Sequence, residues 1–105
     1  MIDFSNHALI RMSQNAVKEE EILYVIYYGE CLYRAGATFF YLRKRDIPEW
    51  DRLDDHWMHL VGTAVVLTKD KRLVITVWRN RRNGLKHIRH KVKYELTDDQ
   101  LSRSH

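Results

Sequence analysis

Apolar residues recur three and four positions apart in two segments near the start of the chain. The first segment, residues 4–14, reads FSNHALIRMSQ, and Ser5 stands where a helix N-cap is expected. The second, residues 18–28, reads KEEEILYVIYY and begins with three glutamates, which complement the positive end of a helix. Gly29 is well placed to end it. The pattern therefore predicts two consecutive amphipathic helices.

Four later segments are rich in β-branched and aromatic residues. They are residues 30–35 (ECLYRA), 38–45 (TFFYLRKR), 60–68 (LVGTAVVLT) and 73–78 (LVITVW). Their nearly continuous apolar runs are typical of central strands that are covered on both faces. The four residues KDKR, between the last two segments, predict a hairpin connection.

Residues 46–59, DIPEWDRLDDHWMH, fit two interpretations. Pro48 can start a short helix. The apolar residues near one stripe of that helix would be Trp50, Leu53, Trp57 and Leu60. The segment can equally be an ordered loop.

The end of the chain adds a possible strand at residues 92–96 and a helical turn within residues 96–105. We therefore predict one α+β domain over residues 1–105. In it, two N-terminal helices pack on a mainly antiparallel sheet of four to five strands.

Composition narrows the class of protein. The single cysteine, Cys31, excludes an internal disulfide and a multi-cysteine zinc site, and its apolar surroundings predict a buried, inert thiol. No apolar run approaches the roughly 20 residues that a membrane span needs, so no membrane association is expected. The start, MIDFSNHALI, lacks a basic region before a hydrophobic run, which favours a cytoplasmic protein without a signal peptide.

Charge is segregated along the chain. Nine of the 18 Lys and Arg residues lie between Lys71 and Lys93, a stretch without Asp or Glu. The rest of the chain therefore carries all 14 acidic residues against nine basic ones. Such a block suits a polyanion partner, although a solvated edge or an acidic protein partner would have the same charge.

The densest part of this block, Trp78–Lys91, follows the last apolar strand directly. Arg79 and Arg81 can project on one side of the strand end, because alternate residues share a face. Arginine offers a planar fork to phosphate oxygens. The predicted nucleic-acid-binding residues are Arg11, Arg81, Arg82, Lys86 and Arg89. The alternative is a strand end that is covered by solvated charge.

Histidines supply the candidate proton carriers. His87 can act as a general acid or base, or serve in surface binding. His7 and Arg11 are four apart on the first helix, where His7 can be a base or can simply cap or pack. Catalysis by His7 requires it to lie near Arg79.

The remaining acidic and histidine clusters have structural interpretations. His56 and His59 are more typical of a solvated face than of a metal site, and Glu19–Glu21 look structural. His87 and His90 lack a neighbouring carboxylate, so no metal is expected there. Glycine-rich phosphate loops and nucleophile motifs are absent, and no cofactor is expected.

Several stretches resemble an uncharacterised bacterial family, domain of unknown function 4258, over about residues 4–91. These stretches are FSNHALIRMSQ, VKEEEI, YGECLYR, and VVL followed by VITVWRNRRNGLKHIR. That family in turn resembles the RelE, ParE and BrnT toxin superfamily, many of whose members are small basic ribonucleases of type II toxin–antitoxin systems. The chain departs from it at Asn15-Ala16, where many relatives have Arg-Gly, and in a very short first strand.

The resemblance implies a RelE/BrnT-like fold and a metal-independent endoribonuclease. The BrnT-like pattern has an Arg at the end of a late strand, which is Arg79 here. Arg79 would stabilise the charge that develops when a ribose 2′-OH attacks its phosphate, with His7 or His87 moving protons. RNA and a cognate antitoxin protein would be the partners. The alternative is a non-catalytic module of the same fold that binds nucleic acid or protein, the latter through an exposed Tyr24 or Tyr28.

Overall fold

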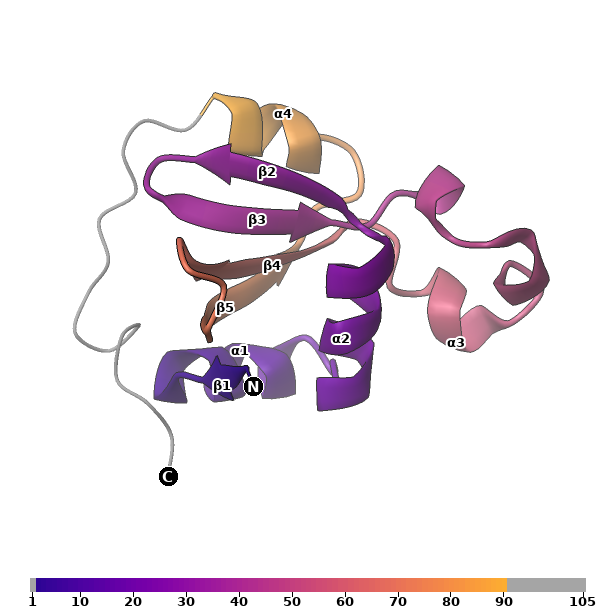
Figure 1. Cartoon of the computed structure of the whole chain (residues 1–105). Helices are drawn as coiled ribbons and strands as arrows, with labels where there is room; N and C mark the ends of the chain where they lie inside the picture. Colours follow the sequence, from indigo (N-terminus) through magenta and orange to yellow (C-terminus); the bar gives the residue numbers. More distant parts are fainter. Residues whose placement is uncertain (1, 91–105) are drawn as a thin grey trace.

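A five-stranded sheet organises the chain in our computed structural model, which describes residues 2–90 (Figure 1). The strands are β1 (Asp3–Phe4), β2 (Glu30–Arg34), β3 (Ala37–Tyr41), β4 (Thr63–Thr68) and β5 (Leu73–Arg79). The α-helices are α1 (Asn6–Gln14), α2 (Glu19–Tyr28), α3 (Asp55–Met58) and α4 (Gly84–Arg89). Two short 3-10 helices, η1 (Lys44–Asp46) and η2 (Glu49–Asp51), precede α3.

The sheet has the strand order β1-β5-β4-β3-β2. Strands β2 to β5 form an antiparallel meander, and only the two-residue β1 runs parallel to its neighbour β5. The prediction of a mainly antiparallel α+β domain is therefore confirmed for the described residues. None of the helices within residues 2–90 is long or apolar enough to cross a membrane.

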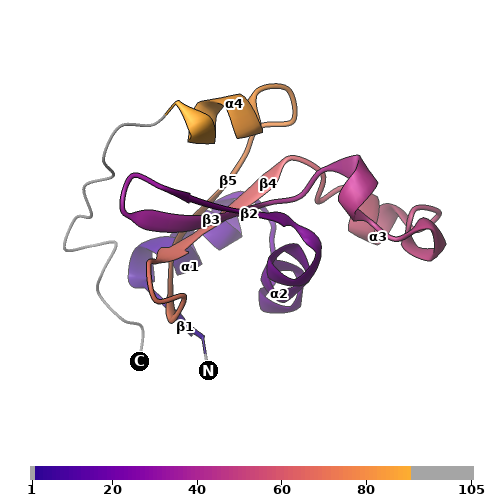
Figure 2. The ribbon, with the colours of Figure 1, turned by 45° about the horizontal axis from the view of Figure 1, so that its top comes forward.

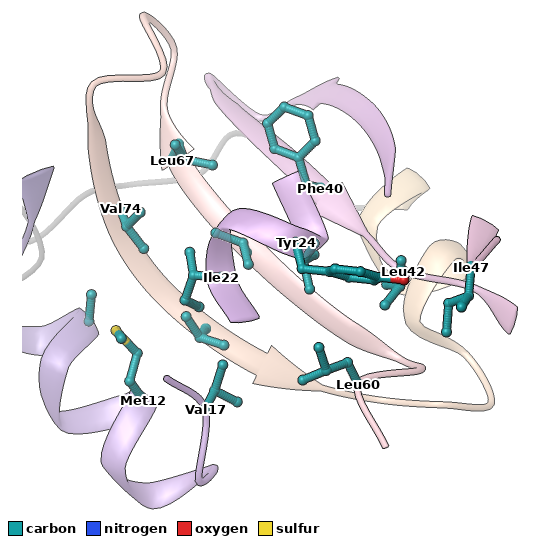
Figure 3. Packing of buried hydrophobic residues seen from close by; sticks show 14 residues of the cluster. Met12, Val17, Ile22, Tyr24, Phe40, Leu42, Ile47, Leu60, Leu67 and Val74 are labelled. Atoms are coloured by element: carbon teal, nitrogen blue, oxygen red, sulfur yellow. The ribbon is translucent and has the colours of Figure 1, made fainter. Parts of the chain in front are cut away.

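Helices α1 and α2 cover one face of the sheet, as the amphipathic pattern predicted (Figure 1). Ser5 is the N-cap of α1, since its hydroxyl accepts a hydrogen bond from the Ala8 amide, and the same hydroxyl donates to the Ile75 carbonyl of β5. Between the helices and the sheet lies the main core, in which Ile22 and Val25 of α2 are fully buried (Figure 3). This packing holds the first turn of α2 against the sheet.

Helix α4 lies on the opposite face of the sheet (Figure 2). Ile88 is fully buried there with Phe39 and Ile75, and Gly84 lies against the Tyr41 ring. Most of the outer side chains of α4 are basic, so the helix presents positive charge over β2 and β3. No helix was predicted for these residues from the sequence.

We expect Gly84→Ala to destabilise the domain by about 1–3 kcal/mol, the usual range for overpacking. An added Cβ would lie 2.1 Å from Cε1 of Tyr41, so α4 or the ring must move. Urea unfolding measures the change, and Lys86→Ala, an exposed change on the same helix, is the control. An unchanged unfolding midpoint in Gly84→Ala would show that α4 does not pack as described.

Several local predictions need correction. Cys31 is exposed rather than buried, because it lies on the edge strand β2. Trp50 and Leu53 are 78% and 95% exposed, so the apolar stripe predicted for residues 46–59 is wrong at these positions. The segment instead forms η1, η2 and α3 in succession. The strand and helical turn predicted beyond residue 91 lie outside the described residues.

Candidate nucleic-acid interface

A basic cleft lies where α4, the start of η1 and the segment after β5 meet. Its volume is about 720 Å³, and none of its lining residues is acidic. The Lys and Arg residues that line it are Arg43, Lys44, Arg81, Arg82, Lys86 and Arg89. We call this feature the basic cleft. It joins residues that are almost 40 positions apart in the sequence.

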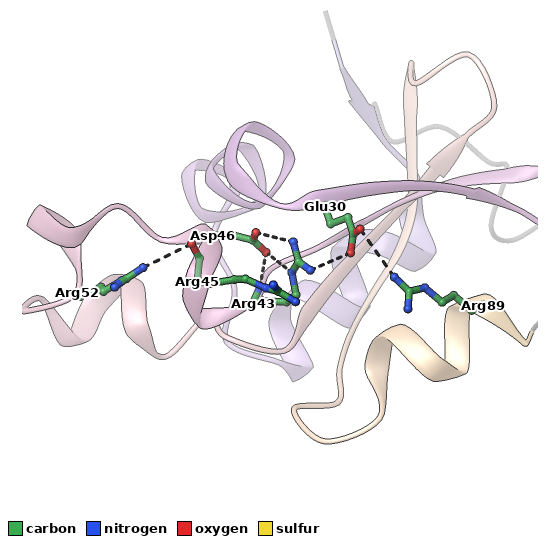
Figure 4. Close-up of polar contacts among 6 residues, drawn as sticks. All are labelled: Glu30, Arg43, Arg45, Asp46, Arg52 and Arg89. Atoms are coloured by element: carbon green, nitrogen blue, oxygen red, sulfur yellow. Dashed lines mark hydrogen bonds and ion pairs between the residues drawn. The ribbon is translucent and has the colours of Figure 1, made fainter.

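Two of the six cations are partly neutralised by neighbouring carboxylates. Arg43 makes a bidentate contact with Asp46, with both N–O distances 2.9 Å, and its Nη1 lies 3.4 Å from Glu30 (Figure 4). The hydrogen bond to Asp46 raises the pKa of Arg43 further above its ordinary value. Arg89 lies 3.9 Å from Glu30 on the other side. Glu30 therefore lies between Arg43 and Arg89, two cations on different elements that line the cleft.

The other cations of the cleft are freer to bind a ligand. Lys44, Arg82 and Lys86 are exposed, and they make no ion pair within residues 2–90. Three exposed positive charges around one hollow create a favourable potential for a polyanion.

Four of the five predicted nucleic-acid-binding residues therefore lie together: Arg81, Arg82, Lys86 and Arg89. Arg11 does not join them. Its Nε donates to the Val77 carbonyl, 3.4 Å away, where α1 crosses β5.

His87, one of the two predicted proton carriers, lies on the other face of the sheet from Arg79. Within residues 2–90 no hydrogen bond or ion pair joins His7 or His87 to Arg79. His87 is exposed on α4, with its ring edge-on to Trp78 at a centroid distance of 5.6 Å. Trp78 packs on the α4 side of the sheet, and Arg79, the next residue on β5, points to the opposite face.

Arg79 sits at the end of β5 on the side of α1 and α2. Its Nε donates to the Thr63 hydroxyl at 3.3 Å, and its Nη2 is buried without a hydrogen-bond partner among the described residues. Burial and then the charge of Arg81 lower the pKa of Arg79, while Glu21 acts in the opposite direction. A half-buried arginine with one free donor group is suited to holding an anion.

A second group of polar residues lies beside Arg79. Glu21 is only 3% exposed, and its Oε2 lies 3.0 Å from Nε2 of His56 and 3.5 Å from Nε2 of His59. Its Oε1 accepts the backbone N–H of Lys18, which completes the cap of α2. We call Glu21, His56 and His59 the Glu21 cluster. Sequence reasoning treated these residues as structural or solvated and therefore missed it.

A signal for Glu21 was present in the sequence. Glu21, Tyr24, Val25 and Tyr28 follow the spacing i, i+3, i+4, i+7, so Glu21 lies on the face of α2 that turns inward.

Tyr24 stacks on Trp57 at 4.1 Å, and its hydroxyl donates to Asp51. Burial and this hydrogen bond raise the pKa of Tyr24. These contacts hold residues 51–57 against α2.

Arg81 connects the basic cleft with the Glu21 cluster. It lines the cleft, and its Nη2 donates to the His59 carbonyl at 3.2 Å while its Nε donates to that of Val61. The close approach depends on Gly62, which has φ +88° and where a Cβ would lie 2.6 Å from Cγ of Arg81. The two features therefore adjoin at the end of β5.

One family matches residues 4–79, and its description is "Domain of unknown function (DUF4258)". The match covers well over half of the chain. The chain belongs to the DUF4258 family. Arg79 and the Glu21 cluster of this DUF4258 domain lie within the match, whereas Arg81 and α4 lie beyond it. No curated protein and no solved structure matches the chain.

Within residues 2–90 no group of three His, Cys, Asp or Glu side chains is arranged to hold a metal ion. Both histidines of the Glu21 cluster contact the same carboxylate oxygen of Glu21.

Proposed function

We propose that this domain binds RNA in the basic cleft and cleaves it without a metal, as a toxin-like endoribonuclease. The observation that carries the proposal is a cleft that six Lys and Arg side chains line and no acidic side chain enters. Phosphate contacts from such side chains dominate the affinity of proteins for nucleic acids. The arginines at the end of β5 supply the positive charge that a phosphoryl transition state needs.

A non-catalytic nucleic-acid-binding module is the second candidate. It is favoured by the position of His87 on the other face of the sheet from Arg79, because His87 was one of the two predicted proton carriers. A protein-binding role would use another surface of the domain, on α2. Tyr24 is buried and Tyr28 is half-buried, but Leu23 and Tyr27 are exposed on α2, where an antitoxin protein could bind.

The test uses the full-length protein and an end-labelled single-stranded RNA in buffer with EDTA. We expect binding that weakens between 50 and 200 mM salt, since counterions are released from the phosphates, together with cleavage that EDTA does not stop. A matched DNA strand should bind and stay intact, because it lacks the attacking 2′-OH. Salt-dependent binding without cleavage would favour the second candidate. Binding that ignores salt would contradict both nucleic-acid functions.

A further inference from the structure

Two histidines near α3 share one buried carboxylate. The side chains of His56 and His59 are 41% and 39% exposed, whereas that of Glu21 is 4% exposed. The carboxylate therefore lies inside, and both rings reach solvent. Nε2 of each ring lies within ion-pair distance of Oε2 of Glu21, which holds that edge of the ring against the carboxylate and leaves the opposite edge, with Nδ1, directed away from it.

The Glu21 cluster also lies close to the arginines at the end of β5. His59 receives a hydrogen bond from Arg81 on its carbonyl, and Glu21 is close enough to Arg79 for their charges to interact. The Glu21 cluster thus lies beside Arg79, the last residue of β5, and Arg81, two residues further on. The His56 ring also stacks on Trp57 at 4.2 Å, which limits its motion. A phosphate held by the arginines would lie next to two oriented imidazoles.

We propose that His56 and His59 are the proton-transfer pair of the ribonuclease and that Glu21 positions them. This inference rests on the function proposed above and assigns its acid and base. It replaces His7 and His87 in those roles. A purely structural role for the Glu21 cluster, pinning α3 to α2, would affect stability and leave the chemistry unchanged.

The reaction balances without a cofactor. One imidazole takes the proton of a ribose 2′-OH while O2′ forms a bond to the adjacent phosphorus. The bond from phosphorus to the 5′-oxygen breaks, and the other histidine, as imidazolium, donates its proton to that oxygen. The products are a 2′,3′-cyclic phosphate and a 5′-hydroxyl end. Arg79 stabilises the charge on the phosphorus oxygens.

The experiment compares cleavage rate and RNA affinity in full-length variants. We expect His56→Ala and His59→Ala each to lower the rate about 100-fold or more, the usual range for a lost general acid or base, with little change in affinity. Free imidazole should restore part of the rate, which it cannot do for a structural defect. His56→Gln can still hydrogen-bond to Glu21 but cannot transfer protons, so it should stay folded and be slow. Asp55→Asn, an exposed change on the same helix, is the control.

Glu21→Gln tests the positioning role. We expect kcat to fall while KM changes little, because the rings lose their orientation but the cleft is intact. If the wild-type protein cleaves RNA and the histidine variants cleave it equally fast, the inference is overturned and the proposed function stands. Wild-type protein that binds RNA but never cleaves it would overturn the ribonuclease itself, and this inference with it.

Discussion

Replacing Arg79 with alanine should lower RNA cleavage about 100- to 1,000-fold, the range seen when one donor to a developing oxyanion is removed. The loss should appear in kcat, since Arg79 lies outside the lining of the basic cleft and contributes little to holding the rest of the strand. In cells, induction of the wild-type protein should stop growth and degrade RNA, and Arg79→Ala should abolish both effects. Single-turnover cleavage of a labelled RNA measures the rate.

Two variants sharpen this test. Arg79→Lys keeps the charge but loses the planar fork, so it should recover only part of the rate. Arg72→Ala removes an exposed arginine just before the other end of β5 and should cleave normally. Full toxicity and full cleavage in Arg79→Ala would remove Arg79 from the mechanism.

Most of the helices and strands could be predicted from the hydrophobic pattern, because strands that are covered on both faces have long runs of apolar residues. All five residues of β3 are buried, and its unbroken run identified a central strand. Helix α4 escaped detection because only Leu85 and Ile88 mark its inner face, three residues apart, among basic residues. A six-residue helix has too few turns for a periodic signal.

The candidate site was predictable only where its residues are neighbours in the sequence. Charge segregation found Arg81, Arg82 and Lys86 together, but nothing local shows that Arg43 lines the same cleft. The structure shows this because β3 ends beside the segment that follows β5. Tertiary contacts also turn Glu21 from a surface charge at a helix start into a buried carboxylate that two histidines contact.

The double variant Arg82→Glu with Lys86→Glu should weaken RNA binding on the order of 100-fold at low salt, because two phosphate contacts become repulsive. The slope of log affinity against log salt should also fall by about 1.4, since each phosphate contact on a single strand contributes about 0.7. Both side chains are exposed and make no ion pair within residues 2–90, so folding should be unaffected. Fluorescence anisotropy across a salt series measures both quantities.

The matched control for this variant is Lys69→Glu with Arg72→Glu, which makes the same change in net charge at the turn between β4 and β5. That turn lies at the opposite end of the hairpin from Arg79 and the basic cleft. If RNA responded only to net charge, the two double variants would lose affinity equally, and the basic cleft would not be the binding site. A loss confined to Arg82→Glu with Lys86→Glu instead places the phosphates in the cleft.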